Sequence, residues 1–112
     1  MREKTAPTPA ALAAFEGLVA ELADAGVVEG TMFGTRALKL AGKALACLSG
    51  DELAVKLARD TPELGSALEI PGAVLFDPSG MGRPFKDWAL VPSSASDRWP
   101  GLVEDALRLA AA

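Results

Sequence analysis

The segment between residues 35 and 59, TRALKLAGKALACLSGDELAVKLAR, restricts the fold more than any other part of the chain. Leucine and valine alternate there with alanine and lysine, which is the two-residue period of a half-buried β-strand. Two turn signals, Ala41-Gly42 and Ser49-Gly50-Asp51, divide the run. The pattern predicts three antiparallel strands at about 33–40, 43–49 and 52–58. Lys39 and Lys56 then lie on the opposite face from the leucines.

Two helices are expected on either side of these strands. Thr8-Pro9 places a capping hydroxyl before a proline, and apolar side chains follow at helical spacing until Gly26, which predicts a helix over 9–25. Thr61-Pro62 repeats the same device. Because the residue before a proline disfavours the helical conformation, this short second helix must end before Pro71.

The remaining elements are two strands and a last helix. A brief strand is predicted at 73–76, and the apolar run from Trp88 to Val91 predicts a strand covered on both faces. From Trp99 to residue 110, apolar side chains recur at helical spacing. Pro100 must lie in the first turn of that helix, which indicates a start near Ser96 or Asp97.

This order of elements predicts an α+β fold of the type α-β3-α-β2-α, with helices packed on one face of an antiparallel sheet. The 112 residues fit a single domain over 1–112, in which residues 1–7 are expected to be flexible. No apolar run reaches the roughly 18 residues of a membrane-spanning helix, and Pro7 and Pro9 interrupt the start before any signal-type core could form. We therefore expect a cytoplasmic protein without membrane contact.

Composition disfavours several classes of function. The net charge of −4 opposes nucleic-acid binding, although seven basic and six acidic residues between Arg36 and Lys86 leave room for a local basic patch. The chain has no histidine, which excludes histidine-containing zinc sites and histidine-dependent catalytic triads. Cys47 is the sole cysteine and fits a reducing compartment. We expect no metal, no cofactor, no catalytic residues and no enzymatic activity.

Several short motifs have both a functional and a structural interpretation. Gly80-Met81-Gly82-Arg83 could cradle an anion, but it leads into a strand rather than a helix, so a connector is favoured. Trp88 and Cys47 are interpreted as core residues. Asp51-Glu52, in a hairpin turn, is expected to face solvent. Met32-Phe33-Gly34 is interpreted as a bulge or bend entering the first strand.

Two candidate sites follow from these motifs. Four basic residues could form one interaction surface across the sheet, although solvated side chains are the ordinary interpretation of each: Lys39, Lys56, Arg83 and Lys86. Alternatively, Met32, Arg83 and Trp88 could border a small pocket.

The stretch MFGTRALKLAGKALACLSGDELAVKL, followed by GRPFKDWALVP and a terminal amphipathic helix, resembles the TfoX N-terminal domain. The resemblance covers about residues 10–110 and rests on the order and spacing of these motifs. It implies an α-β3-α-β2-α fold close to the YjbR-like and secretion-chaperone-like architecture. Competence regulators of this type carry a second, carboxy-terminal domain, whereas this chain ends at Ala112, so their regulatory role is not expected to transfer.

Three functional hypotheses remain from the sequence. The first is a small non-enzymatic module that binds a protein partner, or pairs with itself, through a sheet edge or a helix face. The second is a nucleic-acid-linked regulator, whose DNA binding would weaken steeply with salt. The third is a small-ligand binder with a pocket near Met32, Arg83 and Trp88. The absence of histidine removes the commonest general base, which ranks a catalytic role last.

Overall fold

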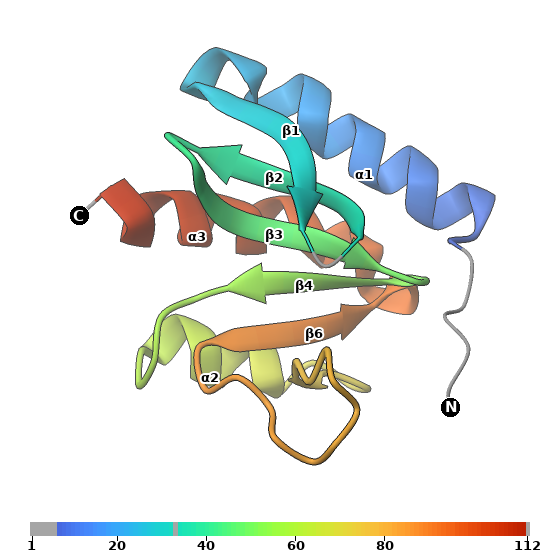
Figure 1. Cartoon of the computed structure of the whole chain (residues 1–112), viewed down its shortest axis with the longest axis vertical. Coiled ribbons are helices and arrows are strands. Elements are labelled where there is room, and N and C mark those ends of the chain that lie inside the picture. The colour runs from blue at the N-terminus through green and yellow to red at the C-terminus, as the bar shows by residue number, and fades with distance from the viewer. Residues whose placement is uncertain (1–6, 33, 112) are drawn as a thin grey trace.

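The computed structural model describes residues 7–32 and 34–111, and within these residues it contains one antiparallel sheet of six strands in the order β1-β2-β3-β4-β6-β5. The helices lie behind this sheet in Figure 1 and cover one face of it. The elements are α1 (Pro9–Leu22), η1 (Ala23–Ala25), β1 (Val27–Met32), β2 (Thr35–Leu40), β3 (Lys43–Ser49), β4 (Glu52–Lys56), α2 (Pro62–Leu68), β5 (Val74–Leu75), β6 (Trp88–Pro92), η2 (Ser93–Arg98) and α3 (Trp99–Ala111). The predicted α+β class is confirmed. The expected flexible start falls mostly on residues 1–6, outside the described residues.

Helix starts agree with the capping signals in the sequence. The Thr8 hydroxyl accepts a hydrogen bond from the Ala11 amide at 3.1 Å, and the Thr61 hydroxyl accepts one from the Leu64 amide at 3.1 Å. Each bond satisfies a backbone donor that has no partner within the first turn of a helix. Helix α3 begins later than expected, at Trp99, because the 3-10 turns of η2 occupy residues 93–98.

The sheet contains one strand that the sequence analysis did not predict. Four strands, rather than three, precede α2 in the described chain, and the additional strand is β1. Met32 pairs directly with Thr35, and Gly34 lies in the turn between them with φ +74°. The interpretation of Met32-Phe33-Gly34 as a bulge or bend is therefore wrong, because the motif joins two strands of a hairpin; Phe33 itself lies outside the described residues.

The main core lies between the sheet and the three α-helices. Leu38, Leu53 and Val55 point into it from the strands and meet Phe15 and Trp99, all of them fully buried. Strand β6 contributes to both sides of the sheet, as its two-sided apolar pattern predicted: Ala89 and Val91 join the main core, and Trp88 and Leu90 join a second cluster. None of the helices in the described residues is both long and apolar enough to cross a membrane.

Candidate interaction surface

The sheet face that points away from the helices, called the open face below, carries mostly small side chains. The register aligns one residue from each strand across it, in the order Gly30, Ala37, Cys47, Ala54, Leu90 and Val74. Ala37, Cys47 and Ala54 are almost completely buried, and Cys47 is 1% exposed. Its thiol therefore belongs to the packed interior, as predicted, and is poorly placed to react.

An aromatic cluster covers the β6 end of the open face. The ring centroid of Trp88 lies 6.1 Å from that of Phe76 and 6.4 Å from that of Phe85. The two phenylalanine rings meet edge to face, with their centroids 6.1 Å apart. These separations are typical of favourable aromatic pairs. Trp88 is only 4% exposed, so the prediction that it is a core residue is confirmed.

The loop after β5 is organised by the carboxylate of Asp77. This carboxylate accepts hydrogen bonds from the backbone amides of Gly80, Gly82 and Arg83 at 3.1, 2.8 and 3.1 Å, and from the Ser79 hydroxyl at 2.8 Å. The hydrogen bond from Ser79, with those from the amides, holds the pKa of Asp77 below its usual range. The amides that could have cradled an external anion thus bind a carboxylate of the same chain, which supports the connector interpretation.

The predicted basic residues lie in two groups. Lys39 and Lys56 lie on the open face, opposite to the buried leucines of their strands. Their strands, β2 and β4, are separated by β3 and therefore lie two strand spacings, or about 10 Å, apart. Arg83 and Lys86 are exposed on the loop that leads into Trp88, which is itself paired with Lys56. A single surface formed by all four side chains stays a prediction.

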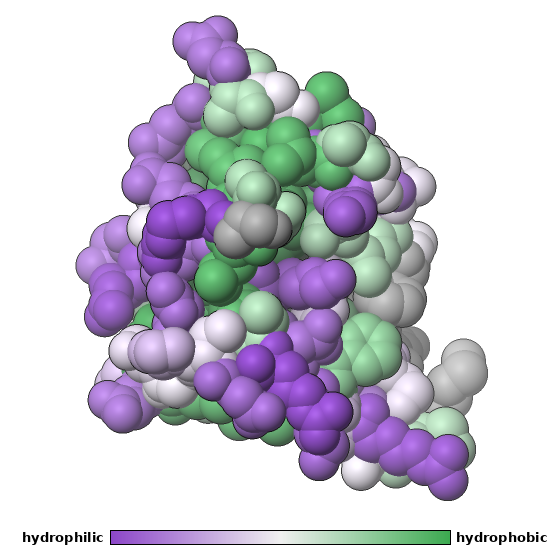
Figure 2. Space-filling model, turned by 90° about the vertical axis from the view of Figure 1, so that its left-hand side faces the viewer, coloured by the Kyte–Doolittle hydropathy of each residue, from purple (hydrophilic) through white to green (hydrophobic). Residues whose placement is uncertain are grey.

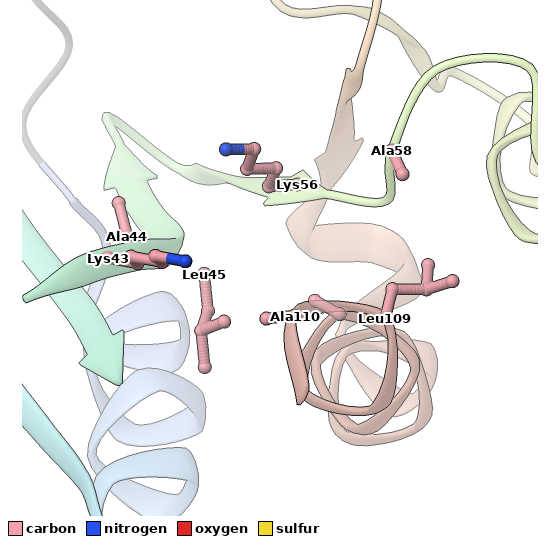
Figure 3. A pocket seen from close by; sticks show the side chains of 8 residues that line it. Lys43, Ala44, Leu45, Lys56, Ala58, Leu109 and Ala110 are labelled. Carbon is pink, nitrogen blue, oxygen red and sulfur yellow. The ribbon is translucent and has the colours of Figure 1, made fainter. Parts of the chain in front are cut away.

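A hollow of about 250 Å³ lies between the end of the sheet and the last turns of α3 (Figure 3). Lys43 and Lys56 are its charged members, and the rest of its lining is apolar: Ala44, Leu45, Ala58, Ala106, Leu109 and Ala110. Of the predicted site residues it contains Lys56, but not Met32, Arg83 or Trp88. Its volume is below the roughly 300–1,000 Å³ of typical small-molecule sites, so it is a weak candidate for a ligand pocket.

Asp51 connects three distant segments. Its carboxylate accepts hydrogen bonds from the hydroxyls of Thr8, which caps α1, and Ser93, which begins η2, both at 2.6 Å. The hydrogen bond from Ser93, followed by that from Thr8, lowers the pKa of Asp51. Asp51 and Glu52 are half-buried rather than fully solvent-facing as expected, because the β3–β4 turn packs against these segments.

Within the described residues, every pKa that departs clearly from its ordinary value shifts toward the charged form. The carboxyl groups of Glu29, Asp51, Glu63 and Asp77 have lowered pKa values, and the pKa values of Arg36 and Arg108 are raised, in most cases chiefly by a side-chain hydrogen bond. A general base near neutral pH needs the opposite shift of a carboxyl group. These groups are therefore suited to structural roles.

Strand β1 forms an edge of the sheet and remains accessible. Val28, Glu29 and Thr31 are exposed, and Gly30 is half-buried, even though α1 lies on the helix side of this strand. Among the described residues β1 pairs with β2 alone, so alternate backbone N–H and C=O groups of β1 point away from the sheet. Figure 2 shows that apolar surface gathers toward the η1 and β1 end of the molecule, whereas hydrophilic side chains gather toward the opposite end.

The charges beside β1 are neutralised within the chain. The Arg36 guanidinium donates to both oxygens of Glu29 at 2.6 and 3.0 Å, donates to Glu16 at 3.2 Å, and lies 5.0 Å from the centroid of the Phe15 ring. The hydrogen bond from Arg36 lowers the pKa of Glu29. Because Glu29 is held in this ion pair, the only charged side chain of β1 is turned toward α1 and does not block the edge.

No protein-family model matches this chain, and comparisons with curated proteins and with solved structures returned no match.

Proposed function

We propose that this chain is a small, non-enzymatic protein-interaction module that adds an extended segment of a partner protein to the edge of β1. Strand addition of this kind gains affinity from backbone hydrogen bonds along the edge, and specificity from the side chains that alternate on the two faces. The observation that carries the proposal is the six-residue β1, accessible along Val28–Thr31 and unpaired on its outer side among the described residues.

The two edges of the sheet are not equivalent. Natural sheets protect their edges with prolines, bulges, exposed charges or very short strands. Strand β5 is only two residues long, which makes it a poor template. Strand β1 is longer, contains no proline, and has its one charge paired with Arg36, while Val28 exposes 60% of its surface on the open face. These differences favour β1 as the binding edge.

The resemblance to the TfoX N-terminal domain remains a hypothesis based on sequence motifs. It is compatible with an interaction role, because chaperone-like relatives of this architecture bind other proteins. The proposed partner binds at strand β1, and the α-β3-α-β2-α order expected from that family does not include this strand. The proposal is therefore independent of the family assignment.

A matched pair of variants tests the proposal. Val28 and Val74 lie on the open face at opposite edges, with 60% and 54% of their surfaces exposed. Val28→Asp places a charge on the proposed binding edge, and Val74→Asp places the same charge on the other edge. We would select extended peptides from a random phage-displayed library on the wild-type chain, and then measure their affinity for each variant.

We expect V28D to lose at least about tenfold in affinity and V74D to bind like the wild type, because a charge on an edge strand disfavours pairing. Thermal melting of both variants verifies that each is folded. Selected peptides that bind V28D as tightly as the wild type, or a library that yields no binder, would contradict strand addition at β1.

A further inference from the structure

We infer that the segment added to β1 carries an acidic residue opposite Gly30, flanked two positions away on each side by apolar residues. This inference rests on the proposed strand addition and specifies its partner. It follows from the position of Lys39 relative to the one glycine in β1.

The Lys39 side chain lies across the open face above Gly30. A Cβ atom placed on Gly30 would lie 3.3 Å from both Cδ and Cε of Lys39 and 3.7 Å from its Nζ. Lys39 belongs to β2, where it pairs with Val28, so its ammonium group reaches over β1 toward the outer edge of the sheet. The absence of a side chain at Gly30 leaves the space that this path requires.

Lys39 is available for a partner. Among the described residues it forms no salt bridge, whereas the nearby Arg36 is paired with Glu29 and Glu16. The charge of Arg36 is thus used to join α1 to the β1–β2 hairpin, and the charge of Lys39 is not used within the described chain.

An incoming antiparallel strand would place one residue directly opposite Gly30. Its Cβ would lie on the open face about 5 Å from the Gly30 position, within reach of the Lys39 ammonium for a carboxylate side chain. The residues two positions before and after it would lie opposite Met32 and Val28 on the same face. Both are apolar, and Val28 is largely exposed, which favours apolar partners there.

A second copy of this chain fits the edge less well. Antiparallel pairing of β1 with β1 must place open-face residues opposite open-face residues, so its centre would be Glu29, Gly30 or Thr31. A centre at Glu29 brings two carboxylates together, and a centre at Gly30 brings two Lys39 ammonium groups together over the same point. A centre at Thr31 pairs only residues 30–32 of each strand, because β1 ends at Met32. Like charges that face each other across strands are destabilising.

The test uses three blocked peptides that differ only at the centre, TVTETVT, TVTQTVT and TVTKTVT, titrated into isotope-labelled protein by NMR. We expect the glutamate peptide to bind about threefold more tightly than the glutamine peptide and more tightly still than the lysine peptide. In Lys39→Met, which keeps an unbranched apolar stem over Gly30 but removes the charge, the preference for glutamate should disappear. In Lys39→Glu, the order should reverse in favour of lysine.

The outcomes separate the two levels of the proposal. Equal binding of all three peptides at β1 would overturn the acidic centre but leave strand addition intact. Absence of binding by every peptide would overturn both. A wild-type dimer in light scattering that V28D abolishes would show that a second copy occupies the edge, which would also overturn the acidic-strand inference.

Discussion

Asp77 shows how a single residue determines the conformation of a loop that has no regular structure. The sequence suggested only that Gly80-Met81-Gly82-Arg83 is conformationally free. The four hydrogen bonds to Asp77 could not be predicted from sequence, because a carboxylate can reach amides three to six residues ahead only after the glycines have turned the chain. Gly80 and Gly82 have φ values of +68° and +77°, which other residues rarely adopt.

The lowered pKa of Asp77 predicts a conformational change of this loop in acid. A group whose pKa is lower in the folded state stabilises the fold at pH values above its unfolded pKa, and that stabilisation is lost as the pH falls through the folded value. We therefore expect the amide resonances of Gly82 and Arg83 to titrate together, with a midpoint below the roughly 3.9 of an unperturbed aspartate. An NMR pH titration measures this.

Two variants control that experiment. Asp77→Asn should show the altered amide shifts at neutral pH, because an amide has a single acceptor oxygen and no charge. Ser79→Ala removes one of the four bonds and should leave the amides of Gly82 and Arg83 close to their wild-type shifts. A midpoint at or above 3.9 would mean that the carboxylate does not hold the loop.

At the scale of elements, the sequence predicted strands well where large apolar residues alternate with smaller or polar ones or form a continuous run, and it failed for β1, which shows neither pattern. Strands β2, β3 and β4 were predicted within two residues at each end, because large apolar side chains alternate with alanine and lysine in β2 and β4, and turn signals bound β3 on both sides. The VVEGTM segment of β1 has no such alternation, since Val28 is exposed and Gly30 has no side chain. An edge strand buries less on either face, so its pattern is weaker.

The same limit applies to the candidate surface. Alternation placed Lys39 and Lys56 on the correct face, but the juxtaposition of Lys39 and Gly30 depends on pairing between two strands, one of which was not predicted. Trp88 and Cys47 were assigned to the interior correctly, because Cys47 lies in an apolar strand and Trp88 is a large aromatic residue that shares its face with Leu90.

Arg36 joins two elements, α1 and the β1–β2 hairpin, and we expect its removal to loosen that contact. Arg36→Gln loses a bidentate ion pair with Glu29 and a cation–π contact with Phe15, each worth at most about 1 kcal/mol at a partly exposed site. The free energy of unfolding should fall by about 1 kcal/mol, measured by urea denaturation at pH 7.

Arg36→Lys serves as the control, because it keeps the charge but not the planar fork, and should retain part of the stability. Since the hydrogen bond from Arg36 lowers the pKa of Glu29, the difference between wild type and R36Q should shrink as the pH falls through that lowered pKa, because the carboxylate then becomes protonated. A difference that is independent of pH would show that the ion pair contributes nothing.

On the scale of the whole molecule, the two faces of the sheet differ in how they are covered. Three α-helices cover one face, whereas small side chains and the aromatic cluster of Phe76, Phe85 and Trp88 cover much of the other (Figure 1). The open face thus lacks a helical layer in the described chain, and a strand added beside β1 would extend it without displacing any element. This asymmetry is the structural basis of the proposed function.

The most direct test of this account is to map where the glutamate peptide binds, by recording amide chemical-shift changes across the assigned spectrum of the protein. We expect the largest changes in β1, over Val28–Met32, with smaller changes at Lys39 and new protection of β1 amides from hydrogen exchange. Changes centred instead on β5, on the 77–87 loop, or on the hollow lined by Lys43 and Lys56 would contradict it.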